Sequence, residues 1–334
     1  MKKYMSILVL VCIIALTTGC GAQKTDKVTD NINDKIKATA VLDWTPNTNH
    51  TGLYVALSKG YFEDEGLDVT IVQPQEGTAE QIVAAGSAQF GISYQEAVTF
   101  ARAENIPIVS IAAVIQHNTS GFASLAEKGI TSPKDFENKK YGGWGSPVEE
   151  ATLRYLMEQE GADPSKLNIL TTGDADFFQV STTGEVDFAW IFEGWTGIEA
   201  KLRGIELNYI ELRKLSDIFD YYTPVIITSE KMIEENNEVV RKFMRAVEKG
   251  YRFCIEKPEE AAEILLENVP ELDRELVMES QKYLAEKYQE DAEYWGMQKQ
   301  EVWERYMLWL YENGFIDEKI DVSKAFTNEF LNRK

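Results

Sequence analysis

Between residues 37 and 210 the chain alternates short β-like runs with amphipathic runs of helical period, and this alternation limits the possible folds more than any other feature. In the first half the runs are ATAVLDW, TGLYVALSKGYFEDEG, LDVTIV, TAEQIVAAGS, AQFGIS, YQEAVTFARAEN and IPIVSIAAVI. The pattern recurs from residue 139 in KKYGGW, PVEEATLRYLMEQEG, LNILTT, DFAWIF and GIEAKLRG. Such alternation is typical of βαβ units around a mainly parallel sheet. We therefore predict an α/β fold with two lobes.

From residue 229 the pattern becomes almost wholly helical. The amphipathic runs are EVVRKFMRAVEKGYRFCI, PEEAAEILLEN, RELVMESQKYLAEKY and EVWERYMLWLYENGF. With 334 residues, 44% of them hydrophobic, the chain can bury one large or two medium cores. We expect these late helices to cap the α/β lobes, and the large apolar residues of the last run, Trp303, Met307 and Trp309, to be core.

The first residues form a targeting signal. Lys2 and Lys3 precede an apolar run at 6–16 that is too short to span a bilayer, and TTGC follows with small residues ahead of Cys20. This segment resembles a bacterial lipoprotein signal, although Thr17 replaces the more usual leucine, so an ordinary secretory signal is the alternative. The resemblance implies removal of residues 1–19, lipidation of Cys20, and a polar, flexible tether over residues 20–36.

Charge and cysteine content exclude several kinds of partner. The chain has 34 Lys plus Arg and 55 Asp plus Glu, a net charge of -21, which opposes binding to nucleic acid or to anionic lipid. We expect no nucleic-acid partner, and membrane contact only through the lipid anchor. Apart from Cys20, Cys12 lies in the removed segment and Cys254 is alone, so we expect no disulfide framework, no metal site and no cofactor.

An internal similarity relates the two halves. Residues 86–106 can be laid on residues 184–205, so that Tyr94 matches Phe192 and Gln95 matches Glu193. In open α/β sheets ligands bind beyond the carboxyl ends of strands, near helix N-termini. The similarity therefore predicts that these positions face one cleft, unless two unrelated βα units happen to look alike.

The stretch DWTPNTNHTGLY at residues 43–54 is the strongest candidate for ligand contact. It holds one of only 2 histidines, His50, in a polar run that includes Asn49 and lies between Trp44 and Tyr54. Neither a buried core nor a solvent loop favours this mixture. We expect Trp44, Asn49 and His50 to contact ligand; the plainer alternative is that His50 caps the helix that follows.

Aromatic and polar residues elsewhere complete the expected site. Tryptophan and tyrosine faces can stack on an aromatic ring, a carboxylate can accept from an exocyclic amine, and the backbone N–H groups of GGWGSP at 142–147 can hold a carbonyl or anionic tail. The plainer alternatives are core packing, a salt bridge from Glu193 to a lysine across the lobes, a tight turn at 142–147 and hinge packing of the tyrosines. The expected ligand-binding set is Trp44, Asn49, His50, Tyr94, Gln95, Gly143, Trp144, Gly145, Ser146, Glu193, Trp195, Tyr221 and Tyr222.

Three blocks carry a resemblance to a known family: residues 43–69, GTAEQIVAAGSAQFGIS and GGWGSPVEE. With the lipoprotein signal they resemble ABC-importer substrate-binding proteins, and more narrowly the ThiY-like group that binds thiamin-pyrimidine precursors, over residues 37–330. The resemblance implies a periplasmic-binding-protein-like fold whose two α/β lobes are joined by a two-stranded hinge, crossing near 123–130 and 223–227. Lobe 1 would comprise residues 37–125 and 225–334, with the late helices packed on it, and lobe 2 would comprise residues 126–224.

The resemblance also implies a function. The chain would capture a small aromatic heterocycle, an aminopyrimidine of the thiamin pathway, and deliver it to an ABC permease and its ATPase. Riboflavin or another flavin-like ring is the first alternative ligand, followed by a sulfonate or nitrate.

An enzymatic role is the remaining alternative. Fungal relatives are synthases with iron-dependent chemistry, and His50 resembles their reactive histidine. Those enzymes carry a cysteine-rich stretch where this chain has DYYTPVIIT, and they need no export signal. We therefore expect a binding protein and not an enzyme.

Overall fold

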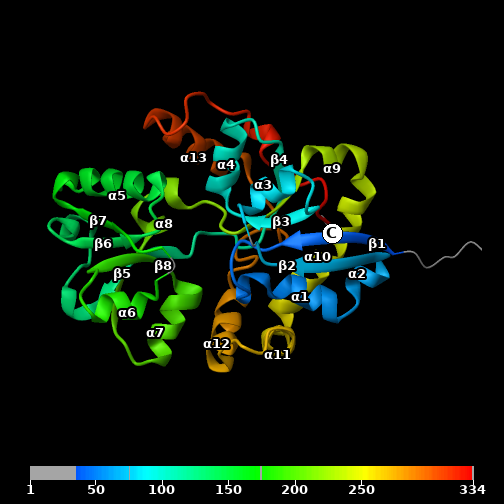
Figure 1. The fold of residues 1–334 in the computed structure, drawn as a ribbon, viewed down its shortest axis with the longest axis horizontal. Helices are drawn as coiled ribbons and strands as arrows, with labels where there is room; N and C mark the ends of the chain where they lie inside the picture. Colours follow the sequence, from blue (N-terminus) through cyan, green and yellow to red (C-terminus); the bar gives the residue numbers. More distant parts are fainter. Residues whose placement is uncertain (1–34, 75, 174, 333–334) are drawn as a thin grey trace, which may run out of the picture. The chain divides into compact units, whose positions relative to one another are not determined.

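The computed structural model describes residues 35–74, 76–173 and 175–332, and within them the chain builds two five-stranded sheets (Figure 1). The expected signal at 1–19, Cys20 and the tether up to residue 34 lie outside the described residues. No helix in the described part of the chain combines the length and the apolar composition needed to cross a bilayer.

The first sheet has the order β2-β1-β3-β10-β4. Its strands are β1 Ile36–Val41, β2 Leu67–Val72, β3 Phe90–Ser93, β4 Ile108–Ala113 and β10 Val225–Ser229. β1 is parallel to β2 and β3, and β10 is antiparallel to β3 and β4. The connections carry α1 Thr51–Ser58, α2 Tyr61–Asp64, α3 Ala79–Ala84 and α4 Gln95–Ala103, which confirms the predicted strand–helix alternation.

The second sheet has the order β7-β6-β8-β5-β9, with one antiparallel strand in the same fourth position as in the first sheet. Its strands are β5 Ser120–Leu125, β6 Lys140–Gly143, β7 Asn168–Thr171, β8 Phe188–Phe192 and β9 Leu207–Glu211. The helices are α5 Pro147–Gln159, α6 Phe177–Thr182, α7 Ile198–Leu202 and α8 Leu212–Leu215. The predicted two-lobed α/β class is confirmed: lobe 1 is built on the first sheet and lobe 2 on the second.

The chain crosses from lobe 1 to lobe 2 at residues 114–119 and returns at 220–224. The Val114 N–H donates to the Pro224 carbonyl at 2.9 Å and ties the two crossings together. The outward crossing was expected near 123–130, with the lobe boundary at residue 125. β5 pairs with β8 and β9, however, so residues 120–125 already belong to lobe 2. The error arose because an apolar strand pattern does not reveal which sheet the strand joins.

The late helices are α9 Glu230–Glu235, α10 Asn237–Glu256, α11 Pro258–Asn268, α12 Arg274–Ala285 and α13 Gln300–Glu312. α10 packs on α1 so closely that a Cβ on Gly250 would lie 2.0 Å from the Gly52 carbonyl oxygen. In Figure 1, α12 lies beside α11 and α13 lies beside α4. α12 also contacts α7 of lobe 2 and the short 3-10 turn Thr48–His50 of lobe 1.

The structure confirms that the large apolar residues of the last helix lie in the core. Trp303, Met307 and Trp309 of α13 are buried in a cluster that draws residues from both lobes. In lobe 2, the ring of Phe122 contacts four other aromatic rings edge-on, with centroids 5.3 to 6.0 Å away. Edge-to-face packing of this kind stabilises each pair by about 0.5–1.5 kcal/mol beyond its burial.

Candidate ligand-binding site

The loop after β1 is held in place by its own side chains. The Asn47 side-chain oxygen accepts the Asn49 N–H at 2.9 Å and caps the 3-10 turn Thr48–His50, which runs directly into α1. The Asn47 N–H in turn donates to Nδ1 of His50 at 3.2 Å. The alternative that His50 caps the following helix is wrong: its side chain accepts a backbone N–H of the 3-10 turn and makes no cap hydrogen bond to α1. The loop is therefore a rigid, hydrogen-bonded structure.

A buried carboxylate lies beneath this loop. Nε2 of His50 is 2.6 Å from Oδ1 of Asp43, and the Tyr94 hydroxyl donates to Oδ2 at 2.5 Å. Because Nδ1 of His50 accepts a backbone N–H, Nε2 must carry the hydrogen and donate to Asp43. Asp43, His50 and Tyr94 therefore form one connected network from the ends of β1 and β3.

Electrostatics keeps Asp43 ionised and Tyr94 protonated. Burial opposes ionisation of Asp43, but attraction to His50 and the hydrogen bonds from His50 and Tyr94 outweigh it, so the pKa of Asp43 lies below its usual value. Burial, reinforced by the charge of Asp43, raises the pKa of Tyr94 well above normal. The carboxylate consequently stays an acceptor and the phenol stays a donor.

The network changes the expected role of His50. Its ring is fully buried and both of its nitrogens are engaged, so His50 presents no free edge to a ligand in this structure. Its Nε2 bonds to Asp43. Asp43 was missed by the sequence reasoning, although an acid at the carboxyl end of β1, seven residues before a histidine, was visible in the quoted stretch.

The side chains around the network differ in exposure. Trp44 is 46% exposed, which leaves its face available for stacking. Asn49 is half-buried, and its carbonyl accepts the Tyr251 hydroxyl at 2.7 Å. Of the three residues expected to bind ligand from this loop, the structure leaves Trp44 the most accessible.

The loop after β6 is folded around another carboxylate that the sequence reasoning missed. Glu149 accepts the N–H groups of Trp144 at 3.1 Å and Ser146 at 2.9 Å, and the Tyr141 hydroxyl at 2.6 Å. Gly145 has a φ of +85°, a conformation that favours glycine. Two N–H groups expected to hold a ligand tail are therefore already bonded within the protein, as the tight-turn alternative predicts.

The rest of this loop is accessible. Ser146 caps α5 by accepting the Val148 N–H at 3.3 Å. Gly143 ends β6 and is buried, whereas Trp144 is 47% exposed, with its ring centroid 6.4 Å from that of Trp190. Trp144 is thus the lobe 2 counterpart of Trp44: a tryptophan left open in the loop after a central strand.

The loop after β8 forms a π-helical turn over Glu193–Gly197. Glu193 pairs with Lys201 at 2.5 Å, within lobe 2 and not across the lobes as the alternative supposed. Trp195 is half-buried and packs against an apolar cluster to which α11 contributes Leu265 and α12 contributes Val277. Glu193 and Trp195 therefore lie at the contact between lobe 2 and the late helices.

The return crossing is held by hydrogen bonds and ring packing that involve Gln95, Tyr221 and Tyr222. The Gln95 N–H donates to the Tyr222 carbonyl and Oε1 of Gln95 accepts the Tyr222 N–H, both at 3.0 Å. The Tyr222 hydroxyl accepts the Lys299 N–H at 2.9 Å, and the Tyr221 ring lies 4.7 Å from that of Tyr306. All three are buried, which matches the hinge-packing alternative for the two tyrosines and places Gln95 with them.

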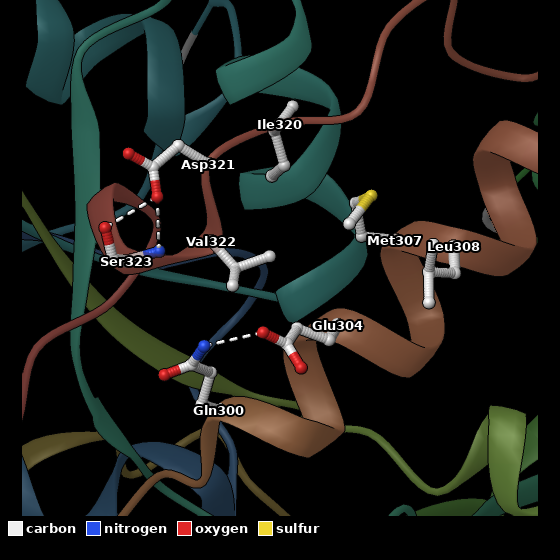
Figure 2. Close-up of a pocket in the computed structure, with 8 residues that line it drawn as sticks. All are labelled: Gln300, Glu304, Met307, Leu308, Ile320, Asp321, Val322 and Ser323. Atoms are coloured by element: carbon white, nitrogen blue, oxygen red, sulfur yellow. Dashed lines mark hydrogen bonds between the residues drawn. The ribbon is translucent and has the colours of Figure 1, made fainter.

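Two surface cavities lie along α13, of about 330 and 540 Å³. Figure 2 shows the smaller one, between α13 and the segment around Val322, where Gln300 donates to Glu304 at 2.5 Å and Ser323 to Asp321 at 2.6 Å. Neither cavity is lined by a residue of the expected ligand-binding set. Within the described residues, no group of three or more His, Cys, Asp or Glu side chains is arranged to hold a metal ion. The one cysteine described, Cys254, is buried.

Comparison with known proteins supports a single family. The formylaminopyrimidine-binding protein of Halalkalibacterium halodurans is 31% identical over 98% of this chain and 99% of its own length. The 4-amino-5-hydroxymethyl-2-methylpyrimidine phosphate synthase of Legionella pneumophila is 24% identical over 89% of this chain and 93% of its own.

The fold is that of periplasmic binding proteins. The alkanesulfonate-binding protein SsuA from Xanthomonas axonopodis pv. citri superposes with a TM-score of 0.68, at 13% identity, over 87% of this chain and 98% of its own. The family described as NMT1/THI5 like matches residues 47–261, which include Asn49, His50, Tyr94, Trp144 and Glu193. Together with the two-lobed fold and the 31% identical relative, this match shows that the chain belongs to the NMT1/THI5-like family.

Proposed function

We propose that this protein is the substrate-binding component of an ABC importer, and that its ligand is an aminopyrimidine of the formylaminopyrimidine or hydroxymethylpyrimidine type. The observation that carries the proposal is the buried Asp43–His50–Tyr94 network, which fixes the loop bearing the exposed Trp44. A rigid loop that holds an aromatic face open lowers the entropy lost on binding a flat ring. The name of the 31% identical relative, a formylaminopyrimidine-binding protein, supports the same ligand class.

The chemistry of the surrounding loops suits such a ligand. Trp44 of lobe 1 and Trp144 of lobe 2 each expose nearly half of their surface. Glu193 keeps a partly exposed carboxylate that can accept from an exocyclic amine, with Lys201 as its present partner. A flat ring with an amino group would stack on a tryptophan face and donate a hydrogen bond to the carboxylate of Glu193.

The protein would act outside the cytoplasm. Cys20, outside the described residues, would carry the lipid anchor, and the tether over residues 20–36 would connect it to the lobes. Closure of the lobes on the ligand would create the form that the permease and its ATPase recognise. The net charge of -21 disfavours additional binding to anionic lipid.

A synthase activity is less well supported than binding. His50, the counterpart of the reactive histidine in the fungal relatives, is buried with both nitrogens bonded. Cys254 lies in the core of lobe 1, and burial raises the pKa of its thiol well above normal, so it is a poor nucleophile or ligand. Neither arrangement favours catalysis.

Titration calorimetry with formylaminopyrimidine, hydroxymethylpyrimidine, riboflavin and an alkanesulfonate tests the proposal. We expect the aminopyrimidines to bind at least about tenfold more tightly than the other two ligands, a difference of about 1.4 kcal/mol. Trp44→Ala should weaken aminopyrimidine binding by about 0.5–1.5 kcal/mol or more, since stacking and burial are both lost. Tyr311→Ala, which removes an exposed aromatic on α13, is the matched control. Tighter binding of riboflavin or the sulfonate would refute the proposed ligand class.

A further inference from the structure

One buried hydroxyl connects the two lobes. Ser280, on α12, is fully buried, and its Oγ lies 2.6 Å from Oγ1 of Thr48 in lobe 1. The same hydroxyl donates to the backbone carbonyl of Gly194 in lobe 2. Because a carbonyl can only accept, the Ser280 hydrogen points to Gly194, and the Thr48 hydroxyl must donate to Ser280. The result is a directed chain from Thr48 through Ser280 to Gly194.

Both ends of this chain belong to loops of the candidate site. Thr48 opens the 3-10 turn that ends at His50, and its carbonyl accepts the Tyr288 hydroxyl at 2.6 Å. Gly194 lies between Glu193 and Trp195 in the π-helical turn. The hydroxyl of Ser280 therefore joins the lobe 1 loop to the lobe 2 loop that carries the carboxylate.

The contact is close as well as polar. A Cβ on Gly194 would lie 3.0 Å from Cδ2 of Leu284 and 3.2 Å from Cδ1 of Tyr283, so α12 lies directly against the π-helical turn. Trp195 packs against the apolar cluster to which this helix contributes Val277. Thr48, Gly194 and Ser280 are all buried, so separation of the lobes would expose these groups to water and break the chain.

We propose that Ser280 is a positioning residue that couples the ligand loop of lobe 1 to closure of lobe 2. The proposal rests on the proposed function, since it assigns Ser280 to the same site without ligand contact. The bond with Thr48 lies within lobe 1, whereas the bond to Gly194 forms only while the π-helical turn of lobe 2 lies against α12, so the Ser280 hydroxyl stabilises this arrangement of the lobes selectively. A ligand held by the loop would dissociate more slowly because of it.

The test compares Ser280→Ala, Thr48→Val and the double variant with the unmodified full-length chain. Ser181→Ala is the matched control, because Ser181 is equally buried but its hydroxyl has no hydrogen-bond partner among the described atoms. We expect Ser280→Ala to weaken formylaminopyrimidine binding about 5- to 30-fold, almost entirely through faster dissociation, with the association rate changed less than about twofold. Thr48→Val should have little further effect in the double variant, since the chain is already broken.

Hydrogen exchange without ligand provides a second, independent measurement. In Ser280→Ala, backbone amides of residues 48–51 and 193–202 should exchange faster together, while those of β1 and β2 stay unchanged. Faster exchange confined to α12, with unaltered dissociation, would indicate a merely structural serine and overturn the proposal. If the unmodified protein does not bind formylaminopyrimidine, the proposed ligand fails. The exchange measurement still decides the role of Ser280: joint acceleration at both loops supports it, and a pattern like that of Ser181→Ala refutes it.

Discussion

The two crossings between the lobes are joined by a histidine whose charge should contribute to stability in a predictable pH range. Nδ1 of His117, on the outward crossing, lies 2.7 Å from Oδ2 of Asp220 on the return crossing. Nε2 of the same ring lies 2.9 Å from Oδ1 of Asp291, in the segment after α12. Asp220 also accepts the Asn118 N–H at 3.1 Å, which fixes the carboxylate. His117 thus ties both crossings to the late part of lobe 1.

These contacts determine the size and the sign of the effect. The hydrogen bond to Asp220, and secondarily the one to Asp291, raise the pKa of His117 to about 9 against the opposing effect of burial. The rise from 6.5 corresponds to roughly 3 kcal/mol at ~1.36 kcal/mol per pKa unit. Because the side chain of Asp291 is 65% exposed and that of His117 27%, solvent screening reduces this to about 1–2 kcal/mol. Because the pKa of His117 is higher in the folded protein than in the unfolded chain, its charge stabilises the folded protein fully below pH ~6.5. This stabilisation is lost as the pH rises through about 9.

His117→Gln removes the charge and keeps a polar side chain of similar reach. The quantity to compare is the free energy of unfolding of the unmodified protein minus that of the variant. We expect this difference to be about 1–2 kcal/mol larger near pH 6 than near pH 10. Urea denaturation followed by circular dichroism at about five pH values across this range measures the difference. Arg213 near Asp220 stays charged throughout, so it does not imitate the titration. Parallel stability curves for the two proteins across the range would refute the reasoning.

Two further predictions concern the carboxylates found beneath the loops. Asp43→Asn should lower the free energy of unfolding by about 2–3 kcal/mol, because one of the two oxygens that accept from His50 and Tyr94 is replaced by an amide that donates. Urea denaturation measures this loss, and an unchanged midpoint would contradict it. Glu149→Gln should speed amide hydrogen exchange at residues 144–146 and cost about 1–3 kcal/mol, because the carboxylate accepts two N–H groups and a hydroxyl there. Unaltered exchange at this loop would show that the turn does not depend on Glu149.

Local patterns in the sequence were sufficient to predict the fold class and to place the candidate residues at strand ends. Strand–helix alternation predicts α/β lobes because the periods of 2 and 3.6 residues reflect which side chains must be buried. The rule that ligands bind beyond the carboxyl ends of strands then indicates the loops after β1, β3, β6 and β8. Those loops carry Trp44, Tyr94, Trp144 and Glu193, at the strand ends where they were expected.

The sequence by itself therefore determined the periodic elements and the ends at which polar loops follow them, since both depend on residues near one another in the chain. Only the tertiary structure decided the burial and the partners of each side chain within a loop. Within the stretch from 43 to 50, Trp44 is exposed, whereas His50 is buried and bonds to Asp43, which also accepts the hydroxyl of Tyr94 from the end of another strand. Ser280 meets Thr48 across 232 residues of chain. Local periodicity in the sequence does not predict such a contact, because the contact exists only when distant elements pack together.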